Sequence, residues 1–403
     1  MSGSPASPLR GAYLVQNPAW RAWLRTADAA LALRAGSREP PPIPTPRRLL
    51  VAIGGHLGDA VIASSAIGLL RRALPHTELG VLVGSWSRPV LEGHPALRHL
   101  HTADHWKLAR GGAPLAERVR RWRASRDAAV AEIRGVGYDA AVDLSAYYPN
   151  MAGLLYGAGI PARIGWSSGG YAPLYTHALP WTYVAAHTAA QHAALLRTIG
   201  SGVVDSALAA APLAYDLPPI GADAAERARR VLDQAGLVAT SYVVVHAGVG
   251  HARKAWPAER WRAVVEALGE EGRAVVLTGA GEDERRGAAA LARGVTGCVD
   301  VTGRLAWEEL RAVVADATLV LSGDTVTAHL AAAARVPVVV VMAAMSDPRH
   351  WRPLGDAVDV LTSAVPCAPC FRSRGCATMA CVREVLASTV LAAARARLAE
   401  GAR

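Results

Sequence analysis

The segment Gly54–Asp59 combines glycines with a carboxylate between two regular patterns. The apolar run before it, at 49–53, is typical of a buried parallel strand, and a helical pattern follows to residue 74. Gly54 and Gly58 let the backbone turn tightly and let a ligand approach closely. Asp59 falls in the first turn of the helix, where it either caps the helix or acts as a general base at the carboxyl end of the strand. The spacing matches neither a dinucleotide fingerprint nor a phosphate loop that ends in Gly-Lys-Ser/Thr.

A second segment of this kind, His246–Lys254, follows the apolar run 242–246 and contains Gly248, Gly250 and Lys254. A glycine-rich turn followed by cations suits a diphosphate, because backbone N–H groups and fixed positive charge both stabilise the anion. Pro257 then fits the first turn of the next helix. The alternative interpretation is a solvated loop whose charge is incidental.

A third strand-to-helix junction runs from Ser322 to Leu330. Thr325 and Thr327 offer hydroxyls, and the start of a helix offers free N–H groups to a phosphate. Asp324 is a candidate cap of that helix, and His329 lies one turn into it. A lone histidine is usually structural, but this one follows a turn that we expect to face a ligand.

Four cysteines lie close together in the sequence, at Cys367, Cys370, Cys376 and Cys381. Four thiols at this spacing could form a tetrahedral zinc site, but the short last intervals differ from those of common zinc ribbons. We therefore favour reduced structural thiols and assign no metal or other cofactor to the chemistry.

The chain is strongly basic, with a formal net charge of +10 over 403 residues. Of its 43 basic residues only Lys107 and Lys254 are lysines. Lys254 therefore stands out, because arginine is the usual basic residue of this chain. Eight basic and three acidic residues fall within 107–134, which is either a solvated helix face or a patch for an anionic acceptor or membrane. No aromatic-interleaved reading motif accompanies the charge, so we do not expect nucleic acid as a partner.

Apolar strand patterns alternate with helical patterns along most of the chain, which predicts an α/β protein with parallel, doubly wound sheets. The alternation restarts after a proline-containing stretch. We expect two Rossmann-like domains that face each other across a cleft. The predicted boundaries are a helix and linker at 1–46, a first domain at 47–211, a linker at 212–221 and a second domain at 222–403, with the cysteine-rich segment at 367–381.

The segment from Ala12 to Gly36 reads as an amphipathic helix that carries tryptophans beside arginines, and a proline-rich stretch follows from Pro40 to Pro46. The helix either packs on the domain surface or lies in a membrane interface. The longest apolar run, 336–345, is too short to span a membrane, and no signal peptide is evident. With five cysteines in a chain of this size, we expect a cytoplasmic protein, with a peripheral contact at the inner face of the membrane as the alternative.

In this order and spacing, the motifs resemble those of glycosyltransferase family 9, the ADP-heptose:lipopolysaccharide heptosyltransferases. The resemblance covers roughly 47–385. The matching pieces are LLVAIGGHLGDAVIASSAIGLLRRALP, RIGW at 163–166, VHAGVGHARKAWPAERW, VTGRLAWEELRAVVADATLVLSGDTVTAHLAAAARVPVVVVM, SDPRHWRPLG and CAPCFRSRGCATMAC. It implies a GT-B fold, with the nucleotide-sugar donor on the C-terminal domain and the acceptor on the N-terminal one.

The resemblance also implies roles for individual residues in an inverting, metal-independent transfer. Asp59 corresponds to the catalytic base and Lys254 to the lysine that binds the diphosphate. Two more sets follow: the donor site comprises Gly248, Gly250, Lys254, Asp324, Thr325 and His329 together with either Glu282 or Glu284, and the acceptor site comprises His56, Gly58 and Arg163.

The expected activity is transfer of a sugar, most simply heptose from ADP-heptose, to a hydroxyl of a glycan or glycolipid resembling the lipopolysaccharide core. Two positions depart from the family pattern: Val326 replaces a glycine of the donor loop, and Ala344–Ser346 replaces Gly-Pro-Thr. They motivate an alternative, a non-catalytic nucleotide-sugar-binding protein of the GT-B fold. A sugar-nucleotide epimerase would need acid and base groups on both sides of the sugar, and Asp59 is the one such group that we place.

Overall fold

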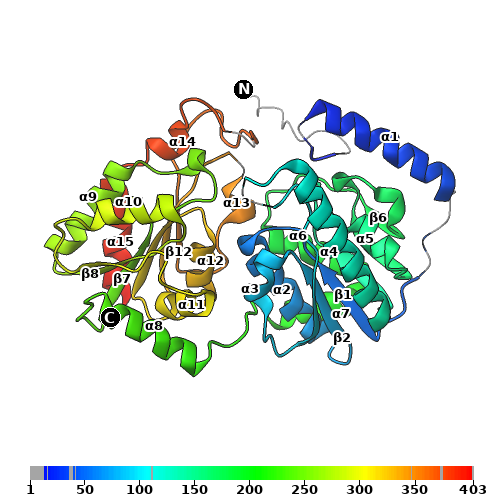
Figure 1. Cartoon of the computed structure of the whole chain (residues 1–403), viewed down its shortest axis with the longest axis horizontal. Helices are drawn as coiled ribbons and strands as arrows, with labels where there is room; N and C mark the ends of the chain where they lie inside the picture. Colours follow the sequence, from blue (N-terminus) through cyan, green and yellow to red (C-terminus); the bar gives the residue numbers. More distant parts are fainter. Residues whose placement is uncertain are drawn as a thin grey trace. The chain divides into compact units, whose positions relative to one another are not determined.

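The computed structural model describes residues 13–15, 17–35, 40, 42–109, 112–345, 347–372 and 375–401. These residues divide into two compact units, one ending at Pro218 and the other beginning at Pro219 (Figure 1). No helix in the described ranges is both long enough and apolar enough to cross a membrane.

The N-terminal unit is built on a six-stranded parallel sheet in the order β3-β2-β1-β4-β5-β6. Its central strands are continuous apolar runs because helices cover both faces of a doubly wound sheet. The strands are β1 (Arg48–Ala52), β2 (Glu78–Val83), β3 (Leu97–Thr102), β4 (Ala140–Asp143), β5 (Ala162–Trp166) and β6 (His177–Leu179).

Helices α2 to α5 alternate with strands β1 to β5, α1 precedes the sheet, and α6 and α7 follow its last strand. They are α1 (Pro18–Ala35), α2 (Leu57–Ala73), α3 (Arg88–Leu91), α4 (Leu115–Val136), α5 (Ala152–Gly157), α6 (Thr188–Leu196) and α7 (Ser201–Ala210), with short 3-10 turns at η1 (Ser85–Ser87), η2 (Ser167–Gly169) and η3 (Ala172–Leu174). Leu24 of α1 is fully buried against Gly170, where an added Cβ would approach its Cδ2 to 2.6 Å. Helix α1 therefore packs on the unit, as the first interpretation of the sequence predicted. The predicted limits Ala12 and Gly36 lie outside the described residues.

The C-terminal unit holds a second six-stranded parallel sheet, in the order β12-β11-β10-β7-β8-β9. Its elements are β7 (Tyr242–His246), β8 (Ala274–Leu277), β9 (Cys298–Asp300), β10 (Leu319–Gly323), β11 (Val338–Val341), β12 (Val358–Leu361), α8 (Ala222–Gln234), η4 (Ala252–Lys254), α9 (Ala258–Glu270), α10 (Glu282–Ala292), α11 (Trp307–Ala315), α12 (Val326–Ala333), α13 (Pro348–Trp351), α14 (Ala380–Arg383) and α15 (Ala387–Gly401). Its core centres on Trp261, which meets Trp256 edge to face at 4.8 Å between ring centroids.

Both sheets share one topology when each is counted from its own first strand: third, second, first, fourth, fifth, sixth. In this doubly wound order the connections run in opposite directions from the first and fourth strands, and ligands bind outside the carboxyl ends of those strands. The two switch points lie between β1 and β4 and between β7 and β10. The predicted α/β class with two Rossmann-like domains is confirmed.

The sequence patterns did not predict the outer strands, which are β3, β5, β6, β9 and β12. Strand β3 interleaves Arg98, His99 and His101 with its leucines, and β6 and β9 have three residues each. Outer strands are short or half-exposed, so they lack the continuous apolar run that marks a central strand.

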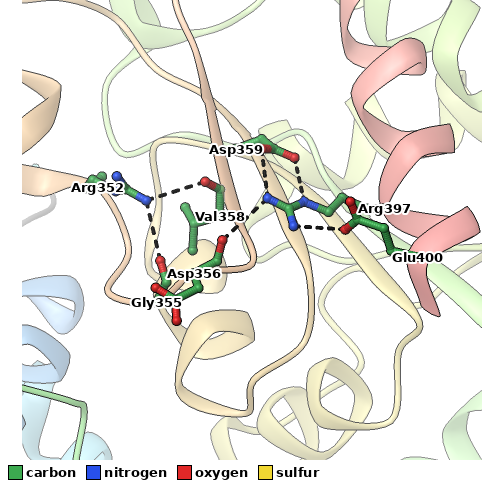
Figure 2. Close-up of polar contacts among 7 residues, drawn as sticks. All are labelled: Arg352, Gly355, Asp356, Val358, Asp359, Arg397 and Glu400. Atoms are coloured by element: carbon green, nitrogen blue, oxygen red, sulfur yellow. Dashed lines mark hydrogen bonds and ion pairs between the residues drawn. The ribbon is translucent and has the colours of Figure 1, made fainter. Parts of the chain in front are cut away.

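The edge strand β12 is held by the C-terminal helix α15 through a bidentate ion pair (Figure 2). The guanidinium of Arg397 donates from Nε to Asp359 Oδ2 at 2.8 Å and from Nη2 to Oδ1 at 2.9 Å. The neighbouring Glu400 accepts from Arg397 Nη1 at 3.1 Å. Hydrogen bonds and charge from Asp359 raise the pKa of Arg397. This direction is expected for a planar guanidinium that binds a carboxylate with two hydrogen bonds.

Candidate active site

Lys254 and Asp324 meet at the switch point of the C-terminal sheet. Lys254 ends the turn η4 after β7, and Asp324 directly follows β10. The Lys254 ammonium donates to Asp324 Oδ2 at 2.6 Å, and the two side chains are 31% and 13% exposed. The pair joins two loops that are distant in sequence and leaves a cation at the edge where ligands of such sheets bind. Asp324 therefore holds Lys254, and it is not the N-cap that the sequence suggested.

Both Glu282 and Glu284 are in the first turn of α10, but only the Glu284 side chain lies beside the loop after β7. The Glu284 carboxylate accepts the N–H of Ala280 at 2.7 Å and fills the space beside Gly248, where any added Cβ would overlap it. Glu282 pairs with Arg285 at 3.1 Å and its side chain is 64% exposed. Glu284 therefore lies against the loop after β7 and Glu282 does not, and a role of either residue at the ribose stays a prediction.

Helix α12 begins with Thr325 at its N-cap, and no side chain bonds the N–H groups of its first turn from that position. The Thr325 hydroxyl lies 3.1 Å from the Ser322 hydroxyl. Thr327 is fully buried, so its hydroxyl does not lie on the surface at the helix start where the sequence placed it. His329 is also buried, inside the helix packing. Thr325 and the backbone N–H groups of the first turn are the polar groups nearest the helix start, and His329 lies behind them one turn into the helix.

Side-chain hydrogen bonds fix the loop after β7 at both of its ends. His246 is buried and its Nδ1 lies 3.1 Å from the Thr278 hydroxyl, which links the carboxyl ends of β7 and β8. Burial lowers the pKa of His246 to about 4, so the ring is neutral at pH 7. Further along, Arg253 donates to the carbonyl of Cys376 at 3.0 Å, and Gly250 is exposed between the two anchors.

The cysteines of the segment 367–381 are free thiols. Burial raises the pKa of Cys381, whereas a hydrogen bond with the Thr378 side chain lowers the pKa of Cys376. Among the residues that the structure describes, no group of three or more His, Cys, Asp or Glu side chains is arranged to hold a metal ion.

In the N-terminal unit, Asp59 occupies the third position of α2 and caps its start. Its Oδ2 accepts the backbone N–H of His56 at 2.7 Å, and the side chain is half-buried. The carboxylate packs against Gly55, where a Cβ would overlap it. The capping interpretation is therefore correct locally. It does not conflict with a role as base, because a carboxylate offers about four lone-pair sites and can accept from a backbone N–H while it takes a proton.

The loop after β4 completes this second switch point and was not singled out in the sequence. Asp143 is fully buried and accepts the N–H groups of Ser145 at 3.0 Å and Met151 at 2.5 Å and the hydroxyl of Tyr175 at 2.8 Å. Burial raises the pKa of Asp143, and these hydrogen bonds oppose the rise. The sequence signal that could have identified Asp143 is a carboxylate at the end of an apolar strand.

Tyr147, in the loop that Asp143 holds, lies within electrostatic reach of Asp59. Burial and the charge of Asp59 raise the pKa of Tyr147 to about 12. The same loop contacts the first one directly, since Ser145 Oγ accepts the N–H of Gly54 at 3.1 Å. The loops after β1 and β4 thus form one surface around Asp59.

His56 and Gly58 lie beside Asp59 as expected, but Arg163 does not. His56 precedes α2 with its ring 6.1 Å from that of Trp86, whose Nε1 donates to the carbonyl of Gly55 at 2.9 Å. Arg163 is the second residue of β5, so it lies toward the amino end of the sheet, opposite the loops that carry Asp59. Its guanidinium donates to the carbonyls of Leu174, Ile160 and Pro161. These bonds give Arg163 a structural role, and nothing in its position supports acceptor binding.

The basic segment 107–134 is mostly a solvated helix face with local partners. On α4, Arg121 pairs with Glu117 and Arg126 with Asp127. Arg118 differs, because its Nη2 donates to the carbonyls of Trp106 at 2.5 Å and Ala109 at 3.1 Å and so braces the loop after β3.

Comparison with known proteins agrees with this architecture. The sequence model of glycosyltransferase family 9 (heptosyltransferase) matches residues 126–379. Lipopolysaccharide heptosyltransferase 3 of Escherichia coli is 26% identical over 306 residues, which cover 73% of this chain and 83% of the relative. The structure of E. coli ADP-heptose lps heptosyltransferase II superposes with a TM-score of 0.69 at 19% identity, over 88% of this chain and 100% of that one. E. coli heptosyltransferase WaaC with ADP-2-deoxy-2-fluoro heptose gives a TM-score of 0.59 at 20% identity, over 87% and 99%.

Two doubly wound units with this topology, matched along nearly the whole length of those structures, define the protein as one with the GT-B fold. Because the family model covers more than half of the chain, the particular family follows: the chain belongs to glycosyltransferase family 9.

Proposed function

We propose that this enzyme transfers heptose from ADP-heptose, with inversion and without a metal ion, to a hydroxyl of a glycan or glycolipid that resembles the lipopolysaccharide core. The observation that carries the proposal is the Lys254–Asp324 pair at the switch point of the C-terminal sheet. The names of the similar proteins, heptosyltransferases of lipopolysaccharide, supply the sugar and the class of acceptor.

The donor site is assigned to the C-terminal unit. The Lys254 ammonium has three N–H donors, and the bond to Asp324 uses one of them, so the others can bind the diphosphate. The N–H groups at the start of α12, with Thr325, add to this positive end, and the backbone at Gly248 and Gly250 permits close approach. Glu284 and His329 complete the donor site, with the Glu284 carboxylate placed to accept from ribose hydroxyls. As the glycosidic bond breaks, Lys254 and the helix start stabilise the charge that collects on ADP, worth about 10²–10³-fold for a single donor group.

The acceptor is assigned to the N-terminal unit, around Asp59, His56 and Gly58. Asp59 takes the proton of the acceptor hydroxyl while that oxygen attacks the anomeric carbon and the bond to the diphosphate breaks. Heptose then has a new glycosidic bond, ADP leaves as the anion, and Asp59 holds the proton. Base catalysis of this kind is worth about 10²–10⁴-fold. The capping bond from His56 holds the carboxylate in one orientation.

A peripheral contact with the inner face of the cytoplasmic membrane is part of the proposal. Helix α1 packs through Leu24 and leaves Trp23 56% and Leu33 87% exposed, with Arg25 and Arg34 exposed beside them. Tryptophan and arginine on one helix face suit an anionic headgroup layer. Sedimentation with vesicles rich in phosphatidylglycerol should capture the wild type, and the double substitution Trp23→Ser with Leu33→Ser should reduce capture. Equal capture of both proteins would remove α1 from the membrane contact.

A second candidate, a protein that binds the nucleotide sugar without transferring it, is favoured by Val326. This half-buried side chain stands at the first position of α12, where glycine is usual in the family pattern. A Cβ there narrows the approach of a phosphate to the helix start. This candidate predicts binding of ADP without turnover.

Calorimetric titration with ADP, UDP and GDP, followed by a transfer assay with ADP-heptose, tests the proposal. We expect a preference for ADP that is lost in Lys254→Ala. Preference for UDP or GDP would keep the fold and replace the donor. Binding of ADP without turnover on any acceptor would select the second candidate, and no binding at all would remove the C-terminal donor site. Activity that persists in EDTA would support a reaction that needs no metal.

A further inference from the structure

A lysine ammonium lies beside two aromatic rings that contact each other, at the carboxyl edge of the N-terminal sheet. Lys107 Nζ is 4.8 Å from the ring centroid of Trp20 and 4.7 Å from that of Tyr148. The three residues come from α1, the loop after β3 and the loop after β4. Trp20 and Tyr148 also contact each other, with centroids 5.3 Å apart. We call this group the aromatic frame.

Within the described ranges no carboxylate forms an ion pair with Lys107, and partial burial lowers the pKa of its ammonium. Two neighbouring titratable groups, His105 and Tyr148, are neutral at pH 7: burial and the charge of Lys107 lower the pKa of His105 to about 4, and burial raises that of Tyr148 to about 12. An exposed ammonium surrounded by neutral rings is ready to pair with an anion from solution.

The loop that carries Lys107 is held firmly. Arg118 donates to the carbonyls on both sides of Lys107, at Trp106 and Ala109, and the backbone N–H of Lys107 donates to His105 Nδ1 at 3.2 Å. The His105 ring in turn stacks on Trp106, with centroids 5.6 Å apart. A preorganised cation and flat apolar faces are the two requirements for binding a charged sugar.

The aromatic frame is connected to Asp59 through two routes in the same unit. Tyr148 follows Tyr147, whose pKa responds to the charge of Asp59. On the other side, Asp104 accepts from the N–H and hydroxyl of Ser85, both at 2.7 Å, and the next residue, Trp86, donates to Gly55. All of these loops follow the carboxyl ends of β1 to β4, where the acceptor is proposed to bind.

We propose that Lys107, Trp20 and Tyr148 form an acceptor subsite that binds a sugar carrying a carboxylate or a phosphate, with the sugar ring against the aromatic faces and the anion on Lys107. The proposal rests on the proposed function, whose acceptor it specifies. Trp20 belongs to α1, which precedes the part of the chain at 47–385 that resembles the family.

A purely structural interpretation is that Lys107 fastens α1 to the unit by cation–π contacts. The substitution Lys107→Met separates the two interpretations, because methionine keeps an unbranched apolar stem beside the rings and removes the charge. Lys107→Gln serves as a second variant with a polar, uncharged end. Lys107 does not belong to the donor site. The affinity of each variant for ADP therefore reports on folding and on the donor site, independently of the sugar subsite.

The probes are glucuronate, glucose 6-phosphate, glucose and inorganic phosphate, titrated into the full-length protein by ligand-observed NMR. We expect both charged sugars to bind wild type about 5- to 10-fold more tightly than glucose, the range of a charge-assisted hydrogen bond at a partly exposed site. Lys107→Met and Lys107→Gln should lose this preference with an unchanged ADP affinity. Trp20→Leu should weaken all three sugars and keep the preference. The two charged probes show which anion is favoured.

Equal binding of glucose and the charged sugars to wild type would overturn the proposal, as would an unchanged preference in both Lys107 variants. Inorganic phosphate that binds as tightly as glucose 6-phosphate would reduce the site to a simple anion site and overturn the sugar subsite. If ADP fails to bind while the Lys107-dependent preference remains, the proposed function fails and the subsite survives. If ADP binds and the preference for charged sugars is absent, the subsite fails and the proposed function survives.

Discussion

The Lys254 ammonium lies 2.6 Å from the carboxylate of Asp324, which is 70 residues further along the chain. The contact crosses the point at which the C-terminal sheet reverses its strand order, and it ties the loop after β7 to the start of α12. A lysine held in this way has already lost most of its rotamer freedom before a ligand arrives. Its side chain is still 31% exposed, so the preorganised cation is accessible.

Replacing Lys254 should impair donor binding more than folding. We expect Lys254→Ala to weaken ADP binding by about 10- to 100-fold in calorimetry, because a charge-assisted hydrogen bond to the diphosphate is lost. Arg286→Ala is a matched control, since it removes an exposed cation of the same unit that pairs with Asp283 on α10. Equal ADP affinity in Lys254→Ala and Arg286→Ala would exclude Lys254 from the donor site.

Asp59 can be tested as base and as cap with two substitutions. Asp59→Asn keeps an oxygen for the N–H of His56 and removes the basic carboxylate, so kcat should fall about 10²–10⁴-fold with little change in melting temperature. Asp59→Ala should lose the same activity and also about 1 kcal/mol of stability, as an N-terminal cap does. Turnover of Asp59→Asn at the wild-type rate would show that another group takes the proton.

Arg163 should matter for stability and not for the acceptor. Arg163→Ala leaves the carbonyls of Leu174, Ile160 and Pro161 without their donor, and we expect a loss of about 1–3 kcal/mol in the free energy of unfolding, measured with urea. The KM for the acceptor should stay within about twofold of the wild type. A raised KM at unchanged stability would return Arg163 to the acceptor site.

Burial of His246 predicts a specific dependence of stability on pH. Its pKa in the folded protein is about 4 and lies below the ordinary value of 6.5, so the unfolded chain binds more protons between these values. This histidine therefore contributes stability that is fully present above pH 6.5 and is lost as the pH falls from 6.5 through about 4.

Urea unfolding of the wild type and of His246→Gln at several pH values measures this contribution. The slope of the unfolding free energy against pH between 4 and 6.5 should be smaller in His246→Gln. His76→Gln, which removes an exposed histidine, should keep the wild-type slope. Identical slopes in all three proteins would mean that His246 titrates alike in the folded and unfolded chain.

The sequence by itself determined the fold class and the main candidates for chemistry. Continuous apolar runs such as 49–53 and 242–246 become central strands because both of their faces are covered, and that requirement is visible locally. Asp59, Lys254 and Asp324 stand at strand-to-helix junctions, and a doubly wound sheet places such junctions at its ligand edge. The half-exposed outer strands were missed, because they bury too little surface to leave a pattern.

Only the tertiary structure decided which side chains meet. Glu282 and Glu284 are two residues apart, and the helix turns one of them toward Gly248 and the other toward solvent. Arg163 was assigned from its motif, but its place near the amino end of β5 directs it away from the ligand edge. The contact of Lys107 with Trp20 joins segments that no local pattern relates. Side-chain partners across loops depend on sheet order and register, and these arise when the whole chain packs.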